Sequence, residues 1–80
     1  MELKFFTGEY CPACELLKPF VKKICRERNI KYKEVDPTEE IEMAAKYNVA
    51  ILPTIEFNGD TLEGWQSESD IIEFLSAVCA

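Results

Sequence analysis

Two cysteines separated by two residues, Cys11 and Cys14, stand where a short apolar run gives way to an amphipathic segment. Residues 3–7 are predicted to form a buried strand, which ends at Gly8. Pro12 suits the first turn of a helix, because the missing N–H of proline would be unpaired there in any case. The cysteine pair therefore restricts the chain to folds in which a helix begins directly after a buried strand.

The rest of the chain continues to alternate between the two kinds of element. The predicted elements are a strand over 3–7, a helix from 11 to about 29, a strand over 30–35, a helix over 38–47, two strands over 54–57 and 61–63, and a final helix that Ser67 caps. Asn58-Gly59-Asp60 between the last two strands is a strong hairpin signal. The order is β-α-β-α-β-β-α, with a parallel first pair of strands and an antiparallel hairpin.

Apolar residues at helical spacing predict the faces that pack on the sheet. These residues are Leu17, Phe20, Val21 and Ile24 in the first helix, Ile41, Ala44 and Ala45 in the second, and Ile71, Ile72, Phe74, Leu75 and Val78 in the third.

Length and charge exclude several classes of protein. Eighty residues predict a single domain over 1–80, and no apolar run approaches the roughly 18 residues that cross a membrane. The net charge of −6 argues against a nucleic-acid partner, since phosphate binding needs a surplus of Lys and Arg. The N-terminal residues do not have the pattern of a secretory signal, so we expect a cytoplasmic protein, and a monomer.

The spacing of Cys11 and Cys14 is suited to disulfide exchange. Cys11 would lie at the helix N-terminus, where free N–H groups favour a thiolate, and Cys14 could then attack a mixed disulfide formed by Cys11. Half of a zinc site, completed by Cys25 and Cys79 because the chain has no histidine, is one alternative. An inert structural bridge is another. Cys25 and Cys79 themselves are expected to be buried or incidental thiols, with a regulatory thiol as the lesser possibility.

The run CPACELLKP (residues 11–19) resembles the active-site helix of thioredoxins, which also have a proline five residues after the second cysteine. On general grounds Pro19 would only kink this helix. The runs KYNV (46–49), LPT (52–54) and NG (58–59) are similar to the thioredoxin pattern around its cis-proline, and the resemblance extends from Phe5 to Leu75. It implies an α/β thioredoxin-like fold with a four-stranded mixed sheet and three helices. It also implies a thiol–disulfide oxidoreductase that reduces protein disulfides through a redox-active Cys11–Cys14 disulfide, with no other cofactor and no metal.

The same resemblance implies a substrate-binding surface around the cysteines. Pro53 would be the cis-proline facing them, and Leu52 would pair through its backbone with an extended substrate. Tyr10 occupies the place of the thioredoxin tryptophan and would flank the site. Trp65 is either an aromatic of the core or hairpin, or a rim residue that contacts substrate. The predicted substrate-binding residues are Tyr10, Pro12, Leu52, Pro53, Gly64 and Trp65.

Several features depart from the thioredoxin pattern. The chain has the size of glutaredoxins, and GWQS (64–67) resembles a segment of glutaredoxin-like redoxins, so a glutathione-dependent glutaredoxin is the main alternative. A non-catalytic metal-binding thiol module is a weaker one. However, Glu39-Glu40 and Glu9 stand where glutaredoxins have basic residues, which favours thioredoxin reductase over glutathione as the electron donor. Phe5 replaces the buried aspartate of thioredoxins, and Lys18 could stabilise a thiolate instead or simply be solvated.

Overall fold

Strand β1 (Glu2–Phe6) lies inside a four-stranded mixed sheet of order β2-β1-β3-β4 in the computed structural model, which describes the backbone of residues 1–79 and side chains as far as Ala77. The other elements are α1 (Pro12–Glu27), β2 (Lys31–Val35), α2 (Ile41–Lys46), β3 (Thr54–Phe57), β4 (Asp60–Glu63) and α3 (Glu68–Cys79). Strand β1 is parallel to β2 and antiparallel to β3, and β3 is antiparallel to β4. The predicted order of elements and the mixed sheet are therefore confirmed.

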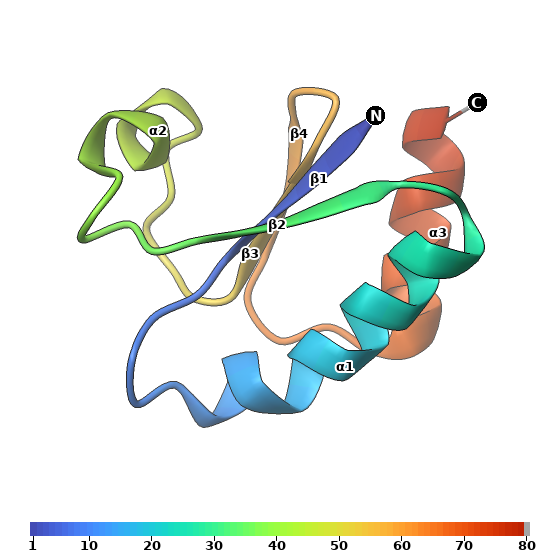
Figure 1. Ribbon diagram of the computed structural model, residues 1–80, viewed down its shortest axis with the longest axis horizontal. Coiled ribbons are helices and arrows are strands. Elements are labelled where there is room, and N and C mark those ends of the chain that lie inside the picture. Colours follow the sequence, from blue (N-terminus) through green and yellow to red (C-terminus); the bar gives the residue numbers. More distant parts are fainter. Residues whose placement is uncertain (80) are drawn as a thin grey trace.

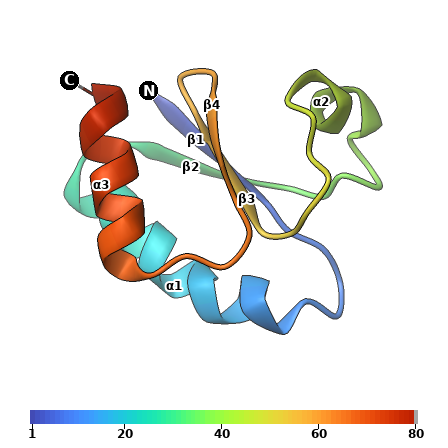
Figure 2. The ribbon, with the colours of Figure 1, turned by 180° about the vertical axis from the view of Figure 1, so that it is seen from behind.

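The two long helices, α1 and α3, cover one face of the sheet, and the short α2 lies on the other side (Figures 1 and 2). Strand residues alternate between these faces, as the pleat requires. The buried core joins the first face to the helices and includes Leu3, Phe5, Leu17, Val21, Ile55, Phe57, Ile71 and Leu75. On the opposite face the Phe6 ring contacts the Tyr47 ring that follows α2.

A partly buried ion pair also lies on the face away from the long helices. The Lys4 Nζ is 3.3 Å from Glu56 Oε1, and Glu56 is only 3% exposed. Burial lowers the pKa of Lys4, but the hydrogen bond and the charge of Glu56 outweigh this and leave the pKa raised. The second carboxylate oxygen of Glu56 accepts the N–H of Gly59, at 2.7 Å. The pairing offsets the cost of burying the Glu56 carboxylate.

Asparagines end the first two helices. Asn29 and Asn48 have φ values of 56° and 53°, the left-handed conformation that asparagine tolerates better than most residues. After α1, the N–H of Ile30 donates to the Cys25 carbonyl at 2.8 Å, and after α2 the N–H of Val49 donates to the Ala44 carbonyl at 2.9 Å. Both ends are Schellman motifs, which satisfy helix carbonyls that have no partner within the helix. The predicted end of α1 near Asn29 is thus confirmed.

Some apolar positions are not where the periodicity predicted. Phe20 is 42% exposed because it flanks the buried stripe of α1. Helix α2 is shorter than predicted, since Asp36 accepts the N–H and hydroxyl of Thr38 and thereby holds the preceding residues in a turn. In this short helix only Ala44 is buried, so the inward positions predicted for Ile41 and Ala45 are wrong. Ile72 is 37% exposed, and the side chain of Val78 lies outside the described residues.

Candidate active site

The register of the strands brings the loop that contains Cys11 close to the segment that leads through Pro53 into β3. Phe6, the last residue of β1, pairs with Thr54, the first residue of the antiparallel β3. The segment that leaves β1 toward Cys11 and the segment that enters β3 through Pro53 therefore lie at the same end of the sheet. Phe6 also pairs with Val35 at the end of β2.

Cys11 is the N-cap of α1. Its backbone is extended (φ −112°, ψ 93°), and its Sγ accepts the backbone N–H of Cys14, at 3.2 Å. Pro12 follows at the first helical position and has no N–H to leave unpaired. In the reduced protein, a thiolate at Cys11 would accept this N–H in a charge-assisted hydrogen bond at the positive end of the helix dipole. The site thus favours the nucleophilic form of Cys11.

Cys14 has a different environment from Cys11. The two sulfurs form a disulfide, with the Cα atoms 5.2 Å apart. Cys14 is 0% exposed and belongs to the buried core, whereas Cys11 is only partly buried. Cys14 is therefore closed to a protein approaching from solvent, and Cys11 is the more accessible residue of the pair.

The Leu52–Pro53 peptide bond is cis, as the resemblance predicted. Pro53 is buried, and Leu52 is partly buried against the same core as Cys11. Gly8, in the loop before Cys11, packs so closely on Leu52 that a Cβ at Gly8 would lie 3.0 Å from Leu52 Cδ1. The two loops are thus in direct contact.

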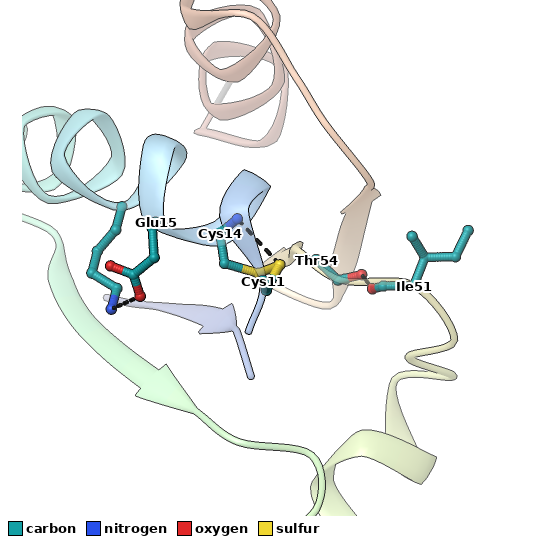
Figure 3. Close-up of a disulfide and its surroundings, with 6 residues drawn as sticks. Cys11, Cys14, Glu15, Ile51 and Thr54 are labelled. Atoms are coloured by element: carbon teal, nitrogen blue, oxygen red, sulfur yellow. Dashed lines mark hydrogen bonds and ion pairs between the residues drawn. A yellow bond between two sulfur atoms is a disulfide. The ribbon is translucent and has the colours of Figure 1, made fainter. Parts of the chain in front are cut away.

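Hydrogen bonds fix the backbone on both sides of Leu52. Thr54 Oγ1 donates to the carbonyl of Ile51 (Figure 3), and the N–H of Gly64 donates to the carbonyl of Pro53, at 2.7 Å. Within the described part of the chain, neither the N–H nor the carbonyl of Leu52 has a hydrogen-bond partner. Gly64 has a φ of 79°, and a Cβ built at Gly64 would lie 4.0 Å from Ile51 Cγ2.

Exposed aromatic and apolar side chains lie near Cys11 and Leu52 in the sequence. Tyr10 is 97% exposed and has a φ of 56°, a left-handed conformation that is uncommon for a bulky residue. Trp65 is 57% exposed and Ile51 is 51% exposed. Trp65 is therefore not a core residue, and its exposure fits both an aromatic that flanks the hairpin and a rim residue that contacts substrate. Pro12 is also exposed.

The charges beside the loop are mostly negative. A groove of about 370 Å³ runs from Thr7 and Gly8 toward the start of α2 and is lined by six carboxylates, those of Glu9, Glu15, Glu34, Asp36, Glu39 and Glu40. Lys18 is the one basic residue among the groove-lining residues of the described chain, and its Nζ lies 3.3 Å from Glu15 and 3.5 Å from Glu34. The hydrogen bond to Glu15 is the main cause of the raised pKa of Lys18. Its charge is thus partly neutralised by carboxylates, so it is not a free cation for the cysteines.

The thiol of Cys25 is free and does not join the pair. Cys25 is 1% exposed in the core, and this burial raises the pKa of its thiol to about 11. The side chain of Cys79 lies outside the described residues. Among those that are described, no cluster of three or more His, Cys, Asp or Glu side chains could hold a metal ion, and none of the helices there is long and apolar enough to span a bilayer.

Sequence reasoning missed three contributors to this site: the hydroxyl of Thr54, the close packing of Gly8, and the exposure of Ile51. A threonine directly after the predicted cis-proline was visible in the sequence, but its hydrogen-bond partner was not. For Gly8 the sequence predicts only that a strand ends there, and not its contact with Leu52.

Comparison with known proteins agrees with this geometry. The thioredoxin family model matches residues 3–79. The chain is 28% identical to a thioredoxin of Rickettsia bellii over 78 residues, covering 89% of this chain and 74% of that protein. It is 32% identical to mouse thioredoxin over 53 residues, covering 65% of this chain and half of that protein. The fold matches thioredoxin 1 of Thermosipho africanus with a TM-score of 0.83 at 19% identity, covering 99% of this chain and 94% of that one. The chain belongs to the thioredoxin family, and its Cys11–Cys14 pair is that of a thiol–disulfide oxidoreductase.

Proposed function

We propose that the protein is a dithiol reductant of protein disulfides in which Cys11 attacks and Cys14 resolves. The observation that carries the proposal is the unequal environment of the two sulfurs. Cys11 is partly exposed and capped by an N–H donor, whereas Cys14 is 0% exposed. An exposed, stabilised thiolate suits the first attack, and a buried thiol suits a second attack that only an intramolecular neighbour can make.

The proposed exchange conserves atoms, electrons and protons. The Cys11 thiolate attacks one sulfur of the target disulfide, whose S–S bond breaks, and the released target thiolate takes up a proton. Cys14 then loses its proton and attacks Cys11 Sγ, which releases the second target thiolate. Two electrons pass to the target, and the protein is left with the Cys11–Cys14 disulfide.

The proposed substrate-binding residues come from the cysteine loop and from residues 52–65. The unpaired N–H and carbonyl of Leu52 would bond to the backbone of an extended target segment, since an antiparallel hydrogen-bonded pair uses both groups of one residue. Pro53 and Gly64 hold that segment of the protein, while Tyr10, Pro12 and Trp65 offer exposed apolar surface. These roles are consistent with disulfide-containing proteins as substrates.

For the electron donor we favour thioredoxin reductase over glutathione. Glutathione is anionic near neutral pH, and the groove beside the cysteine loop has six carboxylates and one paired lysine. Like charges at a rim reduce both encounter rate and affinity, most strongly at low salt. Coupled NADPH oxidation with each donor at two ionic strengths tests this choice. Fast turnover with glutathione and none with the reductase would instead favour the glutaredoxin alternative.

Three further features belong to the same proposal. The protein would work with its cysteine pair alone, without metal or organic cofactor, as a monomer and one domain. A cytoplasmic location would keep the pair available to a reductase, because that compartment maintains thiols in the reduced state. Metal analysis of the reduced protein, sedimentation and cell fractionation would check these points.

The cysteine roles are tested by three serine variants. Cys11→Ser should abolish the reduction of insulin disulfides, and Cys14→Ser should accumulate a mixed disulfide with the target that is visible on a non-reducing gel. Cys25→Ser is the matched control, because Cys25 lies in the core outside the pair. If the control were as inactive as Cys11→Ser, the two-cysteine mechanism would be wrong.

A further inference from the structure

Thr54 is a buried polar residue whose hydroxyl has one partner. Thr54 is 1% exposed, and its Oγ1 donates to the backbone carbonyl of Ile51, three residues earlier. Figure 3 shows this contact on the segment beside the Cys11–Cys14 disulfide. A buried hydroxyl needs a hydrogen-bond partner, and here the partner is the backbone of a segment close to the redox site.

The bond selects which backbone groups of the segment stay free. The Ile51 carbonyl is occupied by Thr54, and the Pro53 carbonyl by the N–H of Gly64. Pro53 has no N–H of its own. The N–H and the carbonyl of Leu52 therefore lie between two carbonyls that hydrogen bonds hold in place. Within the described part of the chain, neither of these two groups of Leu52 has a hydrogen-bond partner.

We propose that Thr54 is a positioning residue for polypeptide substrates. By holding the Ile51 carbonyl, its hydroxyl fixes the orientation of the Leu52 N–H and carbonyl toward an incoming extended segment. The inference rests on the proposed disulfide reduction, and it adds a preference for substrates whose disulfide is part of a polypeptide. Thr54 should matter for disulfides carried by a peptide backbone, and it should not matter for small disulfides that have no backbone to pair.

Two substitutions separate the hydroxyl from the shape of the side chain. Thr54→Val keeps the branched shape and removes the hydrogen bond, and Thr54→Ser keeps the hydroxyl and removes a methyl group. Each variant is assayed with dithiothreitol as the reductant, on a cystine-bridged peptide and on 2-hydroxyethyl disulfide. We expect Thr54→Val to raise KM for the peptide about fivefold, the effect of about one neutral hydrogen bond, with kcat little changed. Thr54→Ser should stay within about twofold of the unsubstituted protein.

The outcomes are distinguishable. An unchanged peptide KM in Thr54→Val, or a Thr54→Ser variant as impaired as Thr54→Val, would overturn the positioning role. Equal losses on the peptide and on 2-hydroxyethyl disulfide would assign Thr54 a purely structural role and would also overturn it. Failure of the proposed function looks different, since the unsubstituted protein would then reduce neither disulfide.

Discussion

Raising the pH above 9 should destabilise the fold through the thiol of Cys25. This side chain is 1% exposed in the core between the sheet and the helices, and burial raises the pKa of its thiol from 9.0 to about 11. In the unfolded chain the thiol ionises near pH 9, whereas in the folded chain it keeps its proton to about pH 11. The unfolded state therefore binds fewer protons between these values. The contribution of the Cys25 thiol to the free energy of unfolding is therefore fully present below pH 9 and is lost as the pH rises from 9 toward 11.

The size of the effect follows from the two pKa values. At pH 10 the unfolded thiol is about nine-tenths ionised and the folded thiol about one-tenth. The free energy of unfolding should then be lower than at pH 7 by on the order of 1 kcal/mol. For a domain of this size, such a change lowers the melting temperature by roughly 4–8 °C.

The assay is urea unfolding followed by circular dichroism at pH 7, 8, 9 and 10, with Cys25→Ala as the control. Both proteins have Cys79→Ser, which limits thiol–disulfide exchange at high pH. Burial also raises the pKa of Tyr32, but Tyr32 is present in both proteins, so its titration cancels in the comparison. The Cys25→Ala substitution costs a pH-independent amount, about 1 kcal/mol for the lost sulfur. The slope of the difference between the two proteins against pH therefore reports Cys25.

A difference that stays constant from pH 7 to pH 10 would refute the reasoning, because it would mean that the thiol ionises equally in both states. A difference that grows in the opposite direction, with the Cys25 protein gaining stability at high pH, would mean that the fold favours the thiolate. Either result would contradict the argument that burial of Cys25 away from solvent raises the pKa of its thiol.

Three other substitutions test packing and pairing. Gly8→Ala places a Cβ 3.0 Å from Leu52 Cδ1, so steady-state kinetics with a cystine peptide should show a KM raised about twofold or more, with little change in urea stability. Lys4→Met leaves Glu56 buried without its cation, and urea unfolding should show a loss of about 1–3 kcal/mol that Lys4→Arg largely avoids. Asn29→Ala, at a φ of 56°, should cost about 1 kcal/mol in the same measurement, whereas Asn29→Gly should not.

The order of elements was predictable because each signal is local. The apolar run before Gly8, the proline after Cys11 and the Asn58-Gly59 turn each act over a few residues. Asn58 and Gly59 have φ values of 53° and 90°, the left-handed pair that a two-residue type I′ hairpin requires.

The misplaced apolar residues have a different cause. Ile41 fits a helical stripe, yet it is 69% exposed because α2 has only six residues and covers little of the sheet. Periodicity gives the face of a helix, but not how much of the sheet that helix covers. Phe20 shows the same limit on a long helix, where one residue at the edge of the stripe remains 42% exposed.

The details of the site depended on contacts between distant segments. The contact of Gly8 with Leu52 and the hydrogen bond of Gly64 to Pro53 arise only after β1 and β3 have paired in register. No local pattern contains that register. The family resemblance predicts the cis bond before Pro53 and the pairing of Leu52 with substrate. It does not predict the hydrogen bond from the Thr54 hydroxyl to the Ile51 carbonyl.

Phe5 raises the question of how Cys14 loses its proton. In the described structure the buried core that contains Cys14 includes Phe5 and no carboxylate, and the buried Glu56 is paired with Lys4 on the other face of the sheet. The overall exchange does not require a protein base, because the two target sulfurs take up as many protons as the two cysteines release. The thiolate that the target releases in the first step can take up the proton that Cys14 gives up. What the fold must provide is proximity, and the Cα–Cα distance of 5.2 Å at the start of α1 provides it without a buried charge.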